Sequence, residues 1–367
     1  MRWSWKICQF RGIGVYMHAT FLILIVFIVF SHWSAGHSLG KTLEGVGFIL
    51  ALFSCVVLHE FGHALMGARF GIKTRDITLL PIGGVARMER IPEEPLQELW
   101  VALAGPAVNV VIAAALYAWI HFTEGFAPLE QLTVTSGPFL ERLMVVNVWL
   151  VVFNMLPAFP MDGGRVLRAL LATKLEYARA TQIAANIGQA MALLFALLGF
   201  FTSPFLMFIA LFVWIGAAQE ASMATMKAAL GGIPVRRAMM TKFHSLRSTD
   251  SLQQAIDLIL ATPQQDFPVL NDSRVVGILP SRDLMIALQQ HGPDSLVERV
   301  MRRDFVSLGA NEMLDVALAR IHTAECCTTA PVIQCDAIVG LLTAENVSEF
   351  MLIVSALGEH RAKLATT

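Results

Sequence analysis

Residues 46–66 read VGFILALFSCVVLHEFGHALM and join an apolar run to a polar motif. Val46–Leu58 is nearly all apolar, as expected of a helix that enters a membrane, and the sequence turns polar at His59. His59, Glu60 and His63 form the pattern His-Glu-x-x-His, and residues four apart share one face of a helix. Two imidazoles on one face can hold a metal ion, with Glu60 beside it to deprotonate water. The stretch therefore predicts a metal site inside a membrane helix.

A five-residue pattern of this kind also arises by chance. Here, however, its ionisable side chains interrupt an apolar span, where such groups are costly unless they are paired or bound to a metal. We therefore favour zinc chemistry over a chance match.

The composition of the whole chain agrees with a membrane protein. Hydrophobic residues make up 56% of the sequence and charged residues only 15%, whereas soluble domains carry roughly 25% charged residues. These values argue against a wholly soluble enzyme and exclude a disordered or fibrous chain. A formal net charge of −1 predicts no nucleic-acid partner. No Cys-x-x-Cys pair is present, so we expect neither a disulfide framework nor a zinc finger. The cysteines are Cys8, Cys55, Cys326, Cys327 and Cys335.

The apolar residues are concentrated before Ala221, in six blocks that we interpret as membrane spans. The fourth block is too short to cross the roughly 30 Å hydrocarbon layer alone. The first block follows basic residues as a signal peptide does, but no Ala-x-Ala cleavage site follows it, so we expect a retained helix. The predicted spans are Val15–Trp33, Val46–Met66, Leu99–Phe122, Leu143–Leu156, Ala184–Phe201 and Pro204–Ala221.

Lysine and arginine are distributed unevenly among the loops between these spans. Every loop rich in them falls on the same side of the membrane, while the alternate loops hold little more than Lys41 and Arg142. Because basic loops stay in the cytoplasm, we expect both termini to be cytoplasmic. The basic residues of that side are Arg2, Lys6, Arg11, Arg69, Lys73, Arg75, Arg87, Arg90, Arg165, Arg168, Lys174, Arg179, Lys227, Arg236 and Arg237.

A catalytic zinc site needs three protein ligands and an open position. The fourth span runs in the same direction as the second, and it ends in NMLPAFPMDGG at residues 154–164. Pro157 and Pro160 break the helix there, and irregular backbone at membrane depth is tolerated only where it lines a cavity or is buried in protein. Asp162 is therefore a candidate third ligand at the depth of the two histidines. The alternative is that Asp162 only caps or turns the chain before Gly163.

These motifs together resemble the site-2 protease family of intramembrane metalloproteases. The resemblance rests on the His-Glu-x-x-His pattern in a span and on the pattern Asn-x-x-Pro-x-x-Pro-x-Asp-Gly, and it covers about the first 225 residues. It implies that one Zn²⁺ is bound by His59, His63 and Asp162. It also implies that Glu60 is the general base and that Asn154 positions the substrate or stabilises the oxyanion. Supporting matches lie in Gly12–His18, Pro81–Met88 and Ala104–Asn109.

The expected reaction is hydrolysis, by zinc-activated water, of a peptide bond in or near the transmembrane segment of a membrane protein. A peptide bond in a helix is shielded by hydrogen bonds, so the substrate must unwind first. Asp76–Leu80 and Val85–Met88 flank Gly83-Gly84 and predict a hairpin or re-entrant element. The edge of this hairpin could hold the unwound substrate by strand addition. The alternative is an ordinary cytoplasmic hairpin.

Three further polar residues of the predicted spans are interpreted as structural. We expect backbone groups to satisfy His18 near the start of the first span, rather than His18 to face the catalytic cavity. We expect Asn109 and Asn147 to form hydrogen bonds between helices.

The sequence after the last span contains an internal repeat. Phe267–Leu270 with Val275–Leu279 recurs, 63 residues on, as Ala330–Ile333 with Ile338–Leu342. Each pair of short apolar strands lies between two amphipathic patterns, which indicates an α/β domain. The predicted helices are Ser251–Ala261, Ser281–Gln290, Glu312–Thr323 and Ala344–Ala356.

The two copies resemble a pair of CBS domains, a module that senses adenosine nucleotides, over about residues 235–357. In that family the turn from strand to helix often reads Gly-h-h-Thr-x-x-Asp, where h is hydrophobic. The resemblance implies nucleotide contacts at Asp283 in the first copy, which lacks the Thr, and at Thr343 in the second, which lacks the Asp. Because neither pattern is complete, a structural role or a homodimer through the CBS domains is the alternative. Asp283 and Thr343 would then cap their helices.

The sequence thus predicts a polytopic α-helical membrane domain of six spans with a small β-hairpin or re-entrant element, followed by an α/β tandem CBS-domain pair. The expected partners are a transmembrane protein substrate, the lipid bilayer and an adenine nucleotide. We expect an integral multi-pass protein of a prokaryotic inner membrane with its CBS domains in the cytoplasm. The expected boundaries are 1–226 for the protease domain, 227–237 for a linker, 238–295 and 296–357 for the CBS domains and 358–367 for a tail.

Two other functions stay open at this point. A transporter or channel gated by CBS domains would use His59, His63 and Asp162 as a site for the transported ion. Glu60 favours the enzyme, because ion passage needs no general base. A catalytically inactive scaffold is the third alternative, and the metal content of the purified protein would test it.

Overall fold

The computed structural model describes residues 3–81, 83–89, 92, 94–123, 137–272, 274–323 and 329–365. The chain divides into two compact units, Met1–Ala224 and Thr225–Thr367, and each is described by itself. Cys326 and Cys327, and the basic residues Arg2 and Arg90, lie outside the described residues. Within them, Cys8, Cys55 and Cys335 are free thiols.

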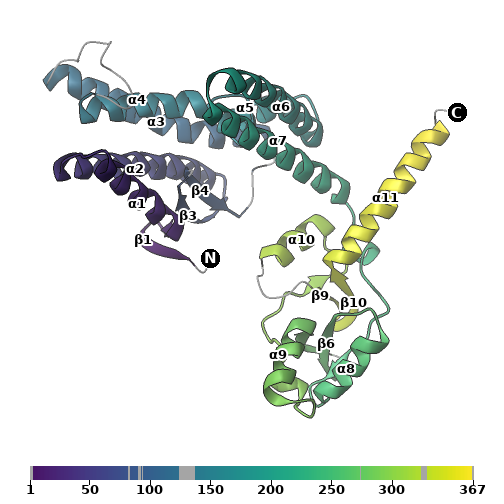
Figure 1. Ribbon diagram of the computed structural model, residues 1–367. Coiled ribbons are helices and arrows are strands. Elements are labelled where there is room, and N and C mark those ends of the chain that lie inside the picture. Colours follow the sequence, from purple (N-terminus) through teal and green to yellow (C-terminus); the bar gives the residue numbers. More distant parts are fainter. Residues whose placement is uncertain are drawn as a thin grey trace. The chain divides into compact units, whose positions relative to one another are not determined.

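Long apolar helices make up most of the first unit (Figure 1). Among the described residues, four helices are long and apolar enough to cross a membrane, which confirms a membrane-type helical domain. They are α2 (Leu39–Arg69), α3 (Pro95–Thr123), α6 (Tyr177–Thr202) and α7 (Pro204–Leu230).

The first and fourth predicted spans correspond to shorter helices. Helices α1 (Ala19–Ser34) and α4 (Phe139–Asn154) have 16 residues each, or roughly 24 Å at 1.5 Å per residue. The first prediction began too early, since Val15–His18 belongs to a strand and α1 starts only at Ala19. His18 caps this helix, because its Nδ1 accepts a hydrogen bond from the Thr20 N–H at 3.3 Å. His18 is therefore satisfied by backbone, as expected.

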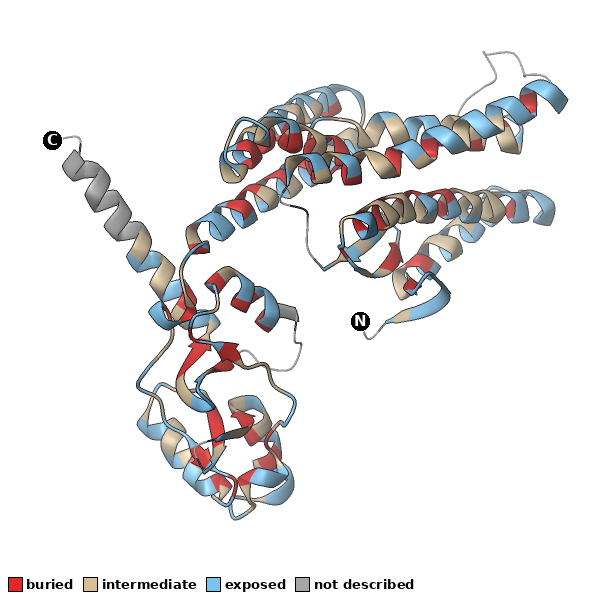
Figure 2. Ribbon diagram, turned by 180° about the vertical axis from the view of Figure 1, so that it is seen from behind, coloured by how far each residue is buried: buried red, intermediate tan, exposed pale blue. Residues whose placement is uncertain are grey.

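Large apolar side chains are exposed along the helices of the first unit. Figure 2 shows exposed residues over much of these helices, with buried residues interspersed. Phe27 and Phe30 of α1, and Phe201, Phe205 and Phe208 of α6 and α7, are all more than half exposed. An apolar surface of this kind suits contact with lipid chains rather than water.

A four-stranded sheet lies against α2. Its strands are β1 (Ser4–Phe10), β2 (Ile13–His18), β3 (Thr74–Leu80) and β4 (Gly83–Met88), in the order β1-β2-β3-β4. Strands β3 and β4 pair antiparallel, which confirms the predicted hairpin, while β2 and β3 pair parallel. Ile13 and Ile77 pack with Ala64 of α2 in one buried cluster. Since Ala64 follows His63, this packing places the sheet beside the polar end of α2.

One short helix completes the first unit. Helix α5 (Asp162–Ala172) follows the irregular segment after α4 and is strongly amphipathic. Its first turn approaches the preceding segment closely, since a Cβ on Gly164 would lie 2.7 Å from the Ala158 carbonyl carbon.

The second unit contains the predicted repeat as two small sheets with flanking helices. The first sheet is β5 (Leu246–Arg247), β6 (Asp266–Asn271) and β7 (Arg274–Pro280), with helices α8 (Leu252–Ala261) and α9 (Ser281–His291). The second is β8 (Leu308–Gly309), β9 (Thr329–Gln334) and β10 (Ala337–Thr343), with α10 (Leu314–Thr323) and α11 (Ala344–Ala365). In both sheets the long pair is antiparallel and the two-residue strand joins it parallel.

Each of the two hydrophobic cores of this unit includes residues that lie outside its own repeat in the sequence. The first core includes Val297 and Met301, which follow the first repeat in sequence. The second core includes Leu230 and Val235, which precede the first repeat. The two copies are therefore tied together by packing as well as by the chain itself.

Candidate functional site

Three side-chain atoms converge inside the first unit. The Nε2 atoms of His59 and His63 lie 3.0 Å apart, and each lies 3.2 Å from Oδ2 of Asp162. Both histidines lie on α2 and Asp162 is the first residue of α5, so elements about a hundred residues apart build the cluster. The three residues are 4–8% exposed. Among the described residues, this is the one group of three or more His, Cys, Asp or Glu arranged to hold a metal ion.

The outer nitrogens of the two imidazoles are held by α3. His63 Nδ1 lies 2.7 Å from the backbone carbonyl oxygen of Val101, and His59 Nδ1 lies 2.5 Å from Oδ1 of Asn109. A carbonyl oxygen only accepts hydrogen bonds, so each Nδ1 donates and each Nε2 of the neutral ring presents a lone pair to the cluster. This is the arrangement in which histidine ligands are oriented at metal sites.

A metal ion fits this donor set. Two Nε2 lone pairs and a carboxylate oxygen meet with no described donor between them, and three buried acceptors repel one another unless a cation lies among them. Zn–N and Zn–O bonds of about 2.0–2.2 Å in tetrahedral geometry place ligand atoms roughly 3.3–3.5 Å apart. The observed separations are close to these values, so the residues suit a zinc ion with two histidines and one carboxylate.

Asp162 reaches the cluster because the chain is irregular before α5. Met161 is the N-cap of α5, and its side chain makes no cap hydrogen bond. The carboxylate of Asp162 instead faces the two histidines. Asp162 therefore lies where a third metal ligand would have to lie, and it is not the N-cap of α5.

Glu60 lies next to the cluster but points to the sheet. Its Oε2 accepts a hydrogen bond from the backbone N–H of Ala86 on β4 at 3.2 Å. The approach of β4 to α2 depends on Gly84, since a Cβ there would lie 2.8 Å from Cγ of Glu60 and 3.1 Å from Cγ1 of Val56. Asn154, the residue expected to position the substrate or stabilise the oxyanion, is the partly buried last residue of α4. Among the described residues, no hydrogen bond joins it to the three converging atoms.

Asn109 and Asn147 do more than join two helices. Both are fully buried, and the Asn109 amide donates to Oδ1 of Asn147 at 2.8 Å, which confirms the expected hydrogen bond between helices. The sequence reasoning missed the bond from Asn109 to His59. The signal was present in the sequence, since Asn109 is the one strongly polar residue in the middle of an apolar span.

Gly105 is a second residue whose role the sequence reasoning missed. A Cβ at this position of α3 would lie 2.6 Å from Nε2 of His59 and still closer to Nε2 of His63. Only glycine leaves room for the two imidazoles at this point of α3. No single-sequence signal separates this glycine from an ordinary helix-packing glycine.

A buried cluster of charges also escaped the sequence reasoning. Arg168 of α5 is 1% exposed and pairs with Glu98 of α3 and Glu220 of α7. Burial alone would lower the pKa of the Arg168 guanidinium, but the neighbouring Glu98 and Glu220 raise that pKa above its ordinary value. The sequence alone marks Arg168 only as a basic residue of a cytoplasmic loop, because its partners are 70 and 52 residues away in sequence.

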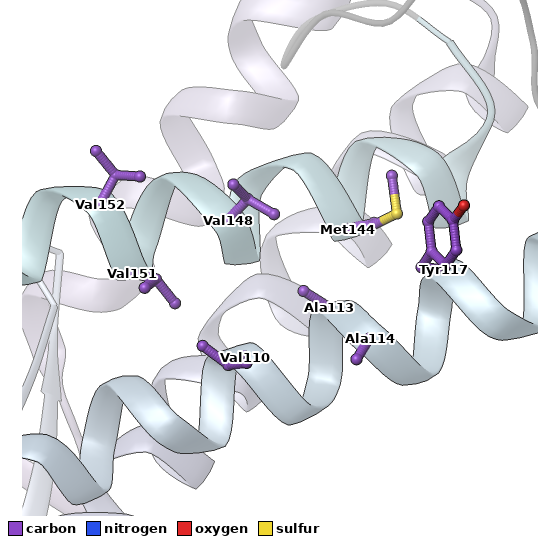
Figure 3. Close-up of a pocket in the computed structure, with 8 residues that line it drawn as sticks. All are labelled: Val110, Ala113, Ala114, Tyr117, Met144, Val148, Val151 and Val152. Carbon is purple, nitrogen blue, oxygen red and sulfur yellow. The ribbon is translucent and has the colours of Figure 1, made fainter.

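An apolar groove runs between α3 and α4 (Figure 3). It has a volume of about 480 Å³. Figure 3 shows its side chains coming from both helices, and none of the candidate ligands lines it. The lining residues are Val110, Ala113, Ala114, Tyr117, Met144, Val148, Val151 and Val152.

A polar cavity of about 620 Å³ lies in the second unit. Thr343 lines it and also caps α11, since its hydroxyl accepts a hydrogen bond from the Asn346 N–H at 3.1 Å. Lys242 and His244 lie on its wall together with acidic residues such as Glu349.

Asp283 of the first repeat has a different environment. Its carboxylate is bonded by the Arg302 guanidinium, with Nη2 at 2.9 Å from Oδ1. Asp283 is not among the residues that line the cavity at Thr343, and the carboxylate that is expected to contact a nucleotide forms an ion pair with Arg302.

Two protein-family models match this chain. Residues 47–195 match the model of peptidase family M50, and residues 235–290 match the CBS domain model. Zinc metalloprotease MJ0392 of Methanocaldococcus jannaschii is 35% identical over 282 residues, which cover 76% of this chain and 78% of that protein. The putative zinc metalloprotease Rip3 of Mycobacterium tuberculosis is 25% identical over 93% of this chain and 91% of its own length.

A solved structure, the site-2 protease from Methanocaldococcus jannaschii, is 37% identical, with a TM-score of 0.45, and covers 60% of this chain and 95% of that chain. The comparisons give no support to the transporter alternative. On the strength of its relatives and its matched domains, this chain belongs to the site-2 protease family of zinc metalloproteases, peptidase family M50, and carries a CBS pair after the protease domain.

Proposed function

We propose that this protein hydrolyses a peptide bond in or near the transmembrane segment of membrane-protein substrates, with one Zn²⁺ held by His59, His63 and Asp162. One observation carries the proposal: two oriented imidazoles and a carboxylate converge beside Glu60, in a buried place between apolar helices. A bound zinc ion supplies a Lewis acid that makes water nucleophilic near neutral pH and polarises a peptide carbonyl.

Glu60 acts in this proposal as the general base. It takes a proton from the attacking water and returns it to the leaving amine. Its carboxylate is not one of the three converging ligands, although Glu60 directly follows one of them in sequence. Asn154 is proposed to position the substrate or to hydrogen-bond the oxyanion, from the end of α4 that precedes Asp162.

Strand β4 is proposed to bind the unwound substrate. It is an edge strand, and the N–H of Ala86 on it reaches Glu60. An extended peptide added to this edge would run past the base, with its own carbonyl groups bonding to the strand. Substrate binding would then replace the hydrogen bond from Ala86 to Glu60 and release the carboxylate for the reaction.

The full topology of six spans is part of the proposal. Helices α1 and α4 would complete the six as shorter membrane helices, with both termini and the CBS pair in the cytoplasm of a prokaryotic cell. The distribution of lysine and arginine supports this orientation. We propose the boundaries 1–226, 227–237, 238–295, 296–357 and 358–367 for the protease domain, linker, two CBS domains and tail.

The CBS pair is proposed to regulate the protease through an adenine nucleotide. The cavity at Thr343 offers hydroxyl, amide and cationic groups and is large enough for such a ligand. Asp283 is a weaker candidate contact, because Arg302 already bonds its carboxylate. Dimerisation through the CBS domains is the second candidate role.

The substitution Glu60→Gln tests the enzyme function directly. It removes the base and keeps the size of the side chain, so we expect cleavage of a co-expressed single-pass membrane protein to be lost while the purified protein still binds one zinc per chain. Glu44→Gln is the matched control on the same helix, since Glu44 pairs with Arg142 on the surface of the unit. Undiminished cleavage by Glu60→Gln contradicts the proposal. Membrane proteins that accumulate uncleaved in cells carrying Glu60→Gln would identify the substrates.

A further inference from the structure

Arg168 is the most buried cation of the first unit among the described residues. It lies on α5, and its guanidinium donates from Nε and Nη2 to Oε1 of Glu98, at 2.8 and 2.5 Å. Nη1 donates to Oε2 of Glu220 at 2.7 Å. The guanidinium also lies over the rings of Phe159 and Tyr177, at 4.9 and 5.0 Å from their centroids. One side chain thus joins α5 to α3, α6 and α7.

Two of the helices joined by this contact, α3 and α5, take part in the metal site. Helix α5 starts with Asp162, and Arg168 follows on the same short helix, roughly 9 Å along its axis. Glu98 lies on the first turns of α3, one turn before Val101, whose carbonyl oxygen holds His63. The same helix continues to Asn109, which holds His59. Helix α3 is therefore the common support of all three candidate ligands, and Glu98 is its hydrogen-bonded link to α5.

We infer that Arg168 is a positioning residue for the metal site: its bonds to Glu98 hold α5 against α3 and thereby set the place of the Asp162 carboxylate relative to His59 and His63. This inference rests on the proposed function, because it assumes that these three residues bind zinc.

The kind of contact supports a positioning role over simple stabilisation. A buried ion pair is weak evidence for stability, since desolvation offsets much of the attraction. A planar guanidinium whose Nε and Nη2 both donate to one oxygen of Glu98 holds the two helices at a defined distance, which apolar contacts between helices do not. Glu220 provides a built-in comparison. It bonds the same guanidinium at a similar distance, but it lies on α7, which contributes no candidate ligand.

The test measures zinc affinity and ligand geometry in the purified full-length protein in detergent. Zinc dissociation constants come from competition with a chelator, and the geometry comes from the visible absorption bands of the protein loaded with Co²⁺. The variants are Glu98→Gln, Arg168→Lys and Glu220→Gln, with thermal unfolding recorded for each. We expect Glu98→Gln and Arg168→Lys to weaken zinc binding roughly 10- to 100-fold, as the loss of supporting contacts does at other metal sites. Their cobalt bands should shift or weaken, while Glu220→Gln keeps the zinc affinity and the cobalt spectrum of the unmodified protein.

Two results would overturn the inference. One is a zinc affinity of Glu98→Gln equal to that of the unmodified protein, and the other is an equal loss in Glu98→Gln and Glu220→Gln, which indicates general destabilisation. If Glu98→Gln yields no folded protein, the zinc affinity of Arg168→Lys is compared with that of Glu220→Gln instead. Lysine keeps the buried positive charge but cannot donate from two nitrogens to Glu98. Two other results would speak against the proposed function itself. In one, the unmodified protein binds no zinc, and in the other, His59→Ala binds zinc with undiminished affinity.

Discussion

Nδ1 of His59 lies 2.5 Å from Oδ1 of Asn109, a residue fifty positions further along the chain and on a different helix. The Asn109 amide in turn donates to Asn147, so a polar path runs from α2 through α3 to α4 inside an apolar unit. Because a buried polar side chain needs partners, each of these residues fixes the orientation of the next. The ring of His59 is thereby aimed at the metal site before any metal binds.

Replacing Asn109 should weaken zinc binding. In Asn109→Leu, Nδ1 of His59 loses its acceptor and the ring loses its fixed orientation, so we expect zinc affinity to fall roughly 10- to 100-fold. Asn147→Leu is the comparison: it removes the next bond of the path but leaves Nδ1 of His59 bonded to Asn109, so we expect a smaller loss of zinc affinity than in Asn109→Leu. Competition with a chelator measures the zinc affinity of both variants. Equal zinc affinities in Asn109→Leu and the unmodified protein would contradict the orienting role.

Adding one methyl group to α3 should empty the site. A Cβ at Gly105 would overlap Nε2 of both histidines, so Gly105→Ala is expected to lose stoichiometric zinc and proteolytic activity together. The matched control is Gly47→Ala on α2, where a Cβ meets nothing within 4 Å. Metal analysis of the purified variants measures the effect. Full zinc content in Gly105→Ala would show that the site lies elsewhere.

The approach of β4 to Glu60 should matter for substrate turnover and not for metal binding. Gly84→Ala places a methyl group against Glu60 and Val56, which forces β4 away from α2. A displacement of about 1 Å at a reacting group can cost on the order of 100-fold in rate. We therefore expect a kcat/KM at least about 10-fold lower, with zinc content unchanged in the same preparation. Loss of zinc in this variant would indicate a wider collapse of the site instead.

In the second unit, Thr343 should contribute to stability as a helix cap. Thr343→Ala removes the acceptor for the Asn346 N–H, and the loss of such a cap costs about 1 kcal/mol. Ser348→Ala on the same helix is the control, because the Ser348 hydroxyl only donates to a carbonyl oxygen one turn back. Hydrogen exchange in the full-length protein measures the stability of α11 in both variants. If Thr343 also contacts an adenine nucleotide, titration of Thr343→Ala with AMP will show weaker binding than titration of Ser348→Ala.

Most of the architecture could be predicted from local patterns. The hairpin at Thr74–Met88 and the strand pairs of the repeat follow from alternation and turn residues that lie close together in sequence. The predicted helices of the repeat agree with α8 to α11 to within one or two residues, except that α11 extends beyond Ala356. The error at Val15–His18 has a cause outside that segment. These residues are apolar enough for a span, and only their pairing with β1 and β3 makes them a strand.

By itself, the sequence determined that two histidines and a glutamate share one turn of an apolar helix, since helical periodicity is a property of neighbouring residues. It also determined the repeat and the membrane character. Only the tertiary structure decided which distant groups hold these residues in place. Asn109, Val101 and Gly105 meet the histidines, and Glu98 meets Arg168, because α2, α3 and α5 pack together in one arrangement. Partners 38 to 70 residues apart leave no periodic pattern in a single sequence, so the surroundings of the metal site depend on helix packing.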